Sequence, residues 1–183
     1  MRSVSRARRH RGAALVAALL GCAGPRMLAA GDHAPDAQGR NQDGALVRLS
    51  QFRGRPLVVY FYPKDRTRGC TIEARSFQVD YARFRALGAE VVGVSNDDVA
   101  SHKGFCSDEA LPFPLLADTD ESIAHAFGVP TRFGFYRRTT FVIDRDGIVR
   151  HVFNSQLQAT RHVEEALQAL RSASGSGAPS RGN

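Results

Sequence analysis

Residues 56–84 read PLVVYFYPKDRTRGCTIEARSFQVDYARF, and this stretch decides the fold because it joins a strand to a helix. Its β-branched and aromatic run, Leu57 to Tyr62, predicts a buried strand, which Pro63 ends because proline cannot donate to a sheet ladder. Apolar residues then recur in steps of three and four, the spacing of one helix face, at Ala74, Phe77, Tyr81 and Phe84. Cys70 is therefore expected to open a helix.

The Cys70 thiol is expected to be the most reactive group of the chain. A thiol at a helix N-terminus meets the positive end of the helix dipole and the unpaired N–H groups of the first turn, and both favour the thiolate. Arg66 and Arg68 flank it and act in the same direction. The alternative is an inert buried cysteine, but a solvated helix start between two arginines argues against that reading. The sequence thus predicts a nucleophilic cysteine.

The length and charge of the chain restrict its class. A chain of 183 residues is long enough for one domain with a core and too short for two of ordinary size. The formal net charge of +7 is concentrated at the start, because residues 1–30 hold six arginines and no acid, which leaves +1 for the rest. That balance gives no reason to expect a nucleic-acid partner.

The first 30 residues resemble an export signal. A basic start, MRSVSRARRHR, precedes the apolar run GAALVAALLG, which is too short to span a bilayer. The sequence LLGC, which ends at Cys22, also resembles a lipoprotein signal, in which the cysteine is lipidated and tethers the protein to a membrane. A plain signal peptide cut near Ala29 or Ala30 is the alternative. We expect export to a bacterial periplasm or cell envelope, or a cytoplasmic protein if translation begins at Met27.

Strand and helix patterns alternate along the rest of the chain. Gly88 is expected to end the Cys70 helix, and Asn96 or Asp97 to cap the next one. The expected elements after the first helix are a strand at 89–95, a helix at 99–108, a short strand within 111–118, a helix at 120–127, strands at 139–144 and 148–153 around an Asp-Gly turn, and a helix at 159–171.

This order predicts an α/β fold with a central mixed β-sheet covered by helices on both faces, an architecture that is thioredoxin-like. The predicted domain spans residues 31–171. The last residues, 172–183, carry too little apolar surface to order themselves and are expected to form a flexible tail.

The segment FYPKDRTRGCTIEARSF resembles the active-site segment of the peroxiredoxins, in particular the bacterioferritin comigratory protein or peroxiredoxin Q group. The similarity continues through VVGVSNDDVASHKGF, LPFPLLADTD and RRTTFVIDRDG, and so covers roughly Gly31 to Arg171. Its most specific part is the pattern Pro-x-x-x-Thr-x-x-Cys, formed by Pro63, Thr67 and Cys70, because here it follows a strand and opens a helix.

The resemblance implies roles for four residues. Cys70 is implied to be the peroxidatic cysteine and Thr67 to offer its hydroxyl to the bound peroxide, while Pro63 shields the pocket and Arg138 supplies a guanidinium. Arg137 competes for that last role, but Arg138 directly precedes TTFVID, as the family arginine does. The simpler alternatives are a helix cap for Thr67 and a surface charge for Arg138.

The chain departs from the group at two positions. Arg75 stands where many members carry the resolving cysteine, and Arg68 where a proline is usual before Gly-Cys. In some members of the group the resolving cysteine lies on the following helix. A resemblance to those members implies a disulfide between Cys70 and Cys106, which forms after local unfolding. The alternative is that Cys106 is a packing residue in a one-cysteine enzyme.

The resemblance implies a thiol-dependent peroxidase that reduces hydrogen peroxide and small organic hydroperoxides, is recycled by a thioredoxin-like reductant and acts as a monomer. An exported thiol–disulfide oxidoreductase is the first alternative, but Glu73 occupies the place of the second cysteine that this class needs. A one-cysteine redox sensor is the second. No cofactor or metal is expected, because the histidines lack ligand spacing at positions 33, 102, 125, 151 and 162.

Overall fold

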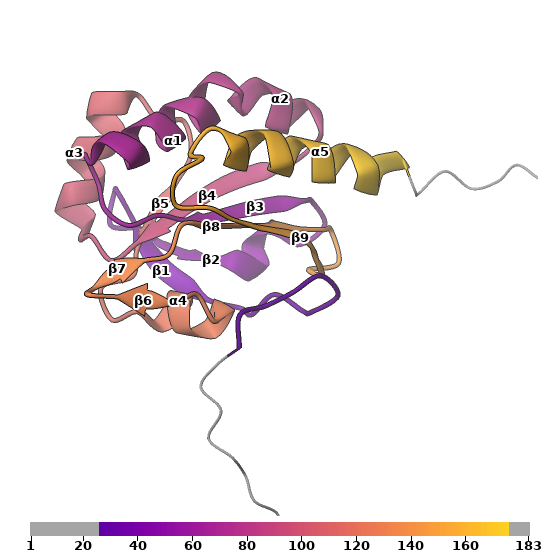
Figure 1. Cartoon of the computed structure of the whole chain (residues 1–183), viewed down its shortest axis with the longest axis horizontal. Coiled ribbons are helices and arrows are strands. Elements are labelled where there is room, and N and C mark those ends of the chain that lie inside the picture. The colour runs from indigo at the N-terminus through magenta and orange to yellow at the C-terminus, as the bar shows by residue number, and fades with distance from the viewer. Residues whose placement is uncertain (1–25, 176–183) are drawn as a thin grey trace, which may run out of the picture.

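A computed structural model describes residues 26–175 and shows a seven-stranded sheet between two layers of helices (Figure 1). The strand order is β2-β1-β5-β4-β3-β8-β9. Three central strands run parallel and the outer ones antiparallel, so the sheet is mixed. Its strands are β1 (Gln38–Asn41), β2 (Leu46–Arg48), β3 (Leu57–Phe61), β4 (Glu90–Ser95), β5 (Leu115–Ala117), β8 (Thr139–Ile143) and β9 (Val149–Asn154).

Strand β3 lies at the centre of the sheet, and every one of its residues is buried. Side chains alternate across a strand, so Val58 and Tyr60 join the core on one face, while Val59 and Phe61 join the core on the other. This two-sided burial explains why the segment is apolar throughout rather than alternating in polarity.

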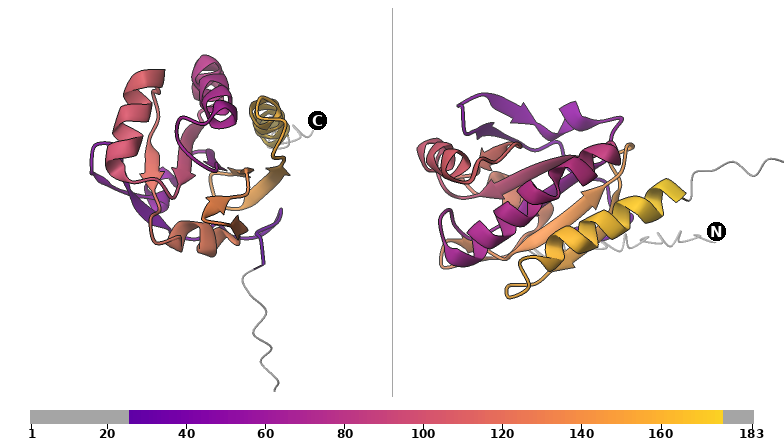
Figure 2. Two further views of the ribbon diagram at one scale, coloured as in Figure 1. Left: turned by 60° about the vertical axis from the view of Figure 1, so that its left-hand side comes forward. Right: turned by 90° about the horizontal axis from the view of Figure 1, so that it is seen from above.

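Helices cover both faces of the sheet (Figure 2). One face carries α1 (Arg68–Val79), α2 (Tyr81–Ala86), α3 (Val99–Glu109) and α5 (Arg161–Gly175). The other face carries α4 (Ser122–Phe127) and the 3-10 helix η1 (Leu49–Phe52). The predicted thioredoxin-like architecture, a mixed sheet flanked by helices on both faces, is confirmed.

Several element boundaries differ from the prediction. The first helix is interrupted at Asp80, so α1 and α2 replace one continuous helix. The cap of α3 is neither Asn96 nor Asp97 but Asp98, whose carboxylate accepts a hydrogen bond from the backbone N–H of Ser101 at 2.8 Å. The last helix continues past Arg171, so residues 172–175 of the predicted tail are helical.

Two features were not predicted. Strands β6 (Thr131–Arg132) and β7 (Phe135–Tyr136) form a separate small hairpin. Residues 26–30, assigned to the leader, contact the domain, since the N–H of Leu28 donates to the carbonyl of Phe127 at 3.0 Å. Cys22 and the rest of the leader, together with residues 176–183, lie outside the described residues. Within residues 26–175, no helix combines the length and apolar character needed to cross a membrane.

Candidate active site

Cys70 lies in the first turn of α1, which follows the carboxyl end of β3 through the loop 62–67. Thr67 occupies the N-cap position with extended backbone, but no side chain caps the helix. Cys70 is 1% exposed although Thr67 and Arg68 before it are exposed, so the helix start reaches solvent while the thiol itself is covered. It packs in the core between sheet and helices, where a covered sulfur depends on neighbouring groups for any charge that it carries.

Arg138 supplies that neighbouring charge. Its Nη2 donates to the Sγ of Cys70 at 3.4 Å, and the arginine is itself 3% exposed. It directly precedes β8, the strand that pairs with β3, which brings the guanidinium to the start of α1. Arg137 is exposed, because successive residues of an extended chain point to opposite sides. The structure thus places Arg138 rather than Arg137 at the thiol.

The flanking arginines do not provide the contact that the sequence analysis expected. The Nε of Arg66 donates to Asp108 of α3 at 3.0 Å. Arg68 is exposed at the first position of α1. The cation that contacts the sulfur therefore comes from a segment far away in sequence.

Glu73 also belongs to the site. The sequence analysis mentioned it only because it occupies the place of the second cysteine of a thiol–disulfide oxidoreductase. It lies one turn after Cys70 on α1, is fully buried, and accepts a hydrogen bond at Oε2 from Nη1 of Arg138. Its Oε1 has no hydrogen-bond partner. Burial raises the pKa of Glu73 to about 8, although the positive charge of Arg138 opposes the rise. Arg138 therefore bridges two buried groups, the thiol of Cys70 and the carboxyl of Glu73.

Thr67 does not act as a side-chain cap. Its hydroxyl donates to the carbonyl of Lys64 at 3.0 Å and so closes the loop that leads into α1. A hydroxyl that donates once keeps two lone pairs, which leaves Thr67 able to accept a hydrogen bond from a ligand. Pro63 lies two residues beyond the end of β3, in the same loop, and is partly buried.

His162 of α5 completes the buried polar cluster. Its Nδ1 lies 2.8 Å from the hydroxyl of Thr140 and its Nε2 lies 2.9 Å from the carbonyl of Ser155. The carbonyl can only accept, so Nε2 carries the proton and Nδ1 accepts from Thr140. Burial lowers the pKa of His162 to about 4, and the imidazole is therefore neutral at pH 7. Its Nδ1 lies 3.7 Å from Oε1 of Glu73.

Cys106 lies on α3 and belongs to the same core as Cys70. Both thiols are free and buried. Burial raises the pKa of Cys106 to about 12, so its thiol is protonated at neutral pH. The folded arrangement thus keeps this second cysteine unreactive.

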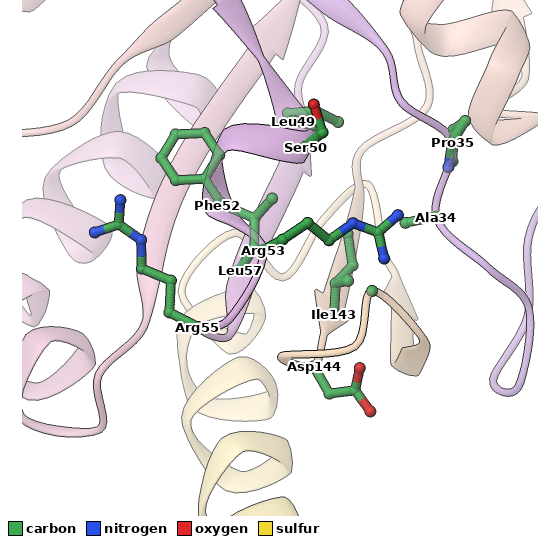
Figure 3. Close-up of a pocket in the computed structure, with 11 residues that line it drawn as sticks. Ala34, Pro35, Leu49, Ser50, Phe52, Arg53, Arg55, Leu57, Ile143 and Asp144 are labelled. Carbon is green, nitrogen blue, oxygen red and sulfur yellow. The ribbon is translucent and has the colours of Figure 1, made fainter.

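A shallow pocket lies at the other end of β3, next to Leu57 and Ile143 (Figure 3). Both arginines that line it already have partners, since Arg53 donates to the carbonyl of Asp146 and Arg55 pairs with Glu90 at 2.9 Å. In Figure 3 the Arg53 side chain extends across the pocket while Arg55 points away from it. No cysteine lines this pocket, so it is separate from the candidate active site.

A thioredoxin-like sheet that presents a cysteine at the start of a helix, with an arginine at its sulfur, is typical of a class of thiol redox proteins. The sequence matches the family model described as the AhpC/TSA family over residues 30–152. The chain belongs to this family, and within it to the peroxiredoxin Q group, which includes the bacterioferritin comigratory proteins. The family resemblance of the sequence is confirmed.

Three relatives illustrate the match. The chain is 46% identical over 144 residues to the chloroplastic peroxiredoxin Q of Oryza sativa subsp. japonica. The aligned region covers 78% of this chain and 66% of the rice protein, so the chain spans slightly under two thirds of that relative's length. It superposes on peroxidoxin BcpB of Mycobacterium tuberculosis with a TM-score of 0.74 and 36% identity, covering 78% and 96% of the chains. For a bacterioferritin comigratory protein of Xanthomonas campestris, described with alkyl peroxide reduction activity, the TM-score is 0.73 at 31% identity, covering 79% and 99%.

Proposed function

We propose that the protein is a thiol peroxidase with Cys70 as its peroxidatic cysteine. The observation that carries this proposal is the contact of Arg138 with the Cys70 sulfur, 3.4 Å, in the uncapped first turn of α1. A fixed guanidinium at the sulfur stabilises the thiolate, which is the form that attacks a peroxide. Family membership supports the same activity.

In the proposed reaction, the Cys70 thiolate attacks the outer oxygen of a hydroperoxide. A sulfur–oxygen bond forms, the oxygen–oxygen bond breaks, and the departing alkoxide or hydroxide takes up a proton, which leaves a sulfenic acid on Cys70. Negative charge therefore moves from sulfur to the leaving oxygen. Arg138 can follow it, because a planar guanidinium presents several donors and never loses its charge. Thr67 accepts a hydrogen bond from the peroxide, and Pro63 shields the pocket.

Glu73 serves this step by remaining protonated. An ionised carboxylate would neutralise Arg138 and compete with the thiolate for its hydrogen bonds. Because burial raises the pKa of Glu73 to about 8, the charge of Arg138 stays available to Cys70 at neutral pH. Glu73 then orients the guanidinium without cancelling its charge.

Cys106 is proposed to resolve the sulfenic acid by forming a disulfide with Cys70. A thiol of pKa about 12 is a poor nucleophile while it stays buried, so local opening must precede the bond. Arg75 contributes no thiol, and its guanidinium pairs with Glu109 at the end of α3. A one-cysteine enzyme, in which an external thiol attacks Cys70, is the alternative.

The proposed substrates are hydrogen peroxide and small organic hydroperoxides, and the reductant is a thioredoxin-like protein. The alkyl peroxide reduction reported for the Xanthomonas campestris relative supports the organic substrates. The basic and apolar leader supports export to a bacterial periplasm or envelope, with Cys22 as a lipidation site. We propose a monomer without cofactor or metal.

A coupled assay tests the function. Reduced protein is mixed with peroxide, thioredoxin, thioredoxin reductase and NADPH, and NADPH oxidation is followed with hydrogen peroxide and with a small alkyl hydroperoxide. Sustained oxidation that requires the protein supports the proposal. A thiol–disulfide oxidoreductase would instead accelerate insulin reduction by dithiothreitol in the absence of peroxide and thioredoxin, and a redox sensor would react once without turnover.

A further inference from the structure

His102 of α3 and Asp65 of the β3–α1 loop form a buried pair that the peroxide step does not use. The Nδ1 of His102 lies 2.9 Å from Oδ2 of Asp65, and the two residues are 0% and 6% exposed. An ionised carboxylate can only accept hydrogen bonds, so Nδ1 carries the imidazole proton. The opposite nitrogen, Nε2, is thereby left as an acceptor.

Asp65 is held in its ionised form by several donors. The hydroxyl of Tyr62 donates to Oδ1 at 2.7 Å, and that of Ser101 donates to Oδ2 at 2.8 Å. Burial acts to raise the pKa of Asp65, but the hydrogen bond and charge of His102, with the bonds from these hydroxyls, bring it below its ordinary value. Asp65 therefore fixes the tautomer and the ring orientation of His102.

Cys106 follows His102 by one helical turn. Residues four apart lie on the same face of a helix, about 5–6 Å apart at Cβ, and the later side chain leans back over the turn of the earlier one. The Nε2 of His102 is buried and has no hydrogen-bond partner among the described residues. An orphaned acceptor and a protonated thiol thus share one buried face of α3.

From this arrangement we infer that His102, oriented by Asp65, is the general base that removes the thiol proton of Cys106 when Cys106 attacks the sulfenic acid of Cys70. The inference rests on the proposed peroxidase function. The Cys106 sulfur forms the disulfide bond, the sulfur–oxygen bond of Cys70 breaks, and His102 takes the thiol proton. That proton then passes to the departing hydroxide, which leaves as water, so Cys106 is oxidised and Cys70 is reduced.

The inference requires α3 to stay folded around His102 and Cys106 while Cys70 moves. Asp98 caps the start of α3, whereas α1 has no side-chain cap. Arg66 and Arg75 reach across from the loop and from α1 to pair with the last residues of α3. The first turn of α1 is therefore the weaker element, and its opening brings the Cys70 sulfenic acid toward Cys106, which stays one helical turn from His102 on α3.

The charged and titratable groups around this pair set its pH response. These groups lie on α3 itself and on the elements packed against His102 and Cys106. They are Asp43, Tyr60, Tyr62, Asp65, Arg66, Asp97 and Asp108. With His102 taking the thiol proton, disulfide formation does not depend on prior ionisation of the thiol, so its rate varies little with pH. Without the base, the rate follows ionisation of the thiol alone and rises about tenfold per pH unit.

The test separates the two chemical steps. Reduced protein is mixed with one equivalent of hydrogen peroxide and quenched at intervals, and mass spectrometry follows the sulfenic acid, trapped with dimedone, and the disulfide. We expect His102→Gln to slow disulfide formation about 100-fold, which is the scale of losing a general base. We also expect the rate in this variant to rise about tenfold per pH unit. Asp65→Asn, which keeps the side-chain shape, is expected to slow it about tenfold. His125→Gln, an exposed histidine on α4, is the matched control.

A disulfide rate in His102→Gln within about threefold of wild type, with an unchanged pH profile, overturns the inference. If the circular dichroism spectrum shows that His102→Gln does not fold, Asp65→Asn is the test variant. Disulfide formation in Asp65→Asn at the wild-type rate then overturns the inference. If the wild type forms no sulfenic acid, the peroxidase proposal fails and the inference falls with it. Sulfenic acid without a Cys70–Cys106 disulfide overturns the inference alone.

Discussion

Arg138 contacts the Cys70 sulfur, and the sequence separates it from Arg137 only through the family resemblance of the segment before TTFVID. The pair Arg137-Arg138 offers two equivalent cations, and only the alternation of the chain entering β8 turns Arg138 toward α1 and Arg137 to solvent. Glu73 is a similar case, because an acid on a helix is ordinarily exposed. Its burial depends on Arg138, a partner 65 positions away in sequence, which no local pattern reveals.

At this scale we predict that Arg138→Ala slows the reaction with peroxide by roughly 100-fold or more, the effect of losing one preorganised donor. Stopped-flow mixing of reduced protein with peroxide measures the rate, and Arg137→Ala is the matched control. An unchanged rate in Arg138→Ala, or a larger loss in Arg137→Ala, would show that the wrong arginine was chosen.

At the scale of elements, the two cysteine-bearing helices differ in how firmly their ends are held. The start of α1 lacks a side-chain cap, although both helices contain a glycine and neither carries an acid in its first turn. Helix α3 is capped by Asp98 and ends in two ion pairs to Arg66 and Arg75. Exposed ion pairs are each worth about 0.2–1 kcal/mol, so the cap and the buried face dominate this difference.

We therefore predict that peroxide-treated wild type forms an intramolecular Cys70–Cys106 disulfide and that α1 opens more than α3. Both thiols are buried and free in the fold, and burial raises the pKa of Cys106 to about 12, so the attack of Cys106 on Cys70 requires local opening. Non-reducing peptide mapping locates the bond, and hydrogen exchange of the oxidised protein compares the helices. A one-cysteine enzyme is indicated if only sulfinylated Cys70 appears and Cys106→Ser turns over as fast as wild type.

The elements that sequence reasoning predicted well are those with strong local signals. The buried run of β3, the periodic face of α1 and the Asp-Gly turn between β8 and β9 were all placed within a few residues. The break at Asp80 was missed because the apolar spacing continues through it into α2. The β6–β7 hairpin was missed because each strand has two residues, too few for a period to show.

For the whole molecule, the contact between α5 and the sheet depends on a histidine buried in its neutral form. His162 accepts a hydrogen bond from Thr140 of β8 and donates to Ser155, so it ties the C-terminal helix to the strand that follows Arg138. The sequence analysis gave this histidine no role beyond its lack of metal-ligand spacing, because its partners lie on other elements. The same buried cluster therefore links the stability of the fold to the site.

This link predicts a loss of stability in acid. The pKa of His162 is lowered to about 4 in the fold, below its unfolded value of roughly 6.5. Between these values only the unfolded chain binds the proton, so stability falls as the pH drops from 7 to 4, by about 3 kcal/mol from this residue. Urea unfolding at pH 7, 5 and 4 measures the loss, and His162→Gln should lack this part of it. Equal losses in both proteins would contradict the assignment.

The central claim, that Cys70 is the thiol that reduces peroxide, is tested most directly by a single turnover with one equivalent of hydrogen peroxide. The account predicts that wild type and Cys106→Ser each consume the equivalent orders of magnitude faster than a free cysteine does. Cys70→Ser should consume none, because a serine hydroxyl is almost never ionised at neutral pH. Peroxide consumption by folded Cys70→Ser at more than a few per cent of the wild-type rate would contradict the claim.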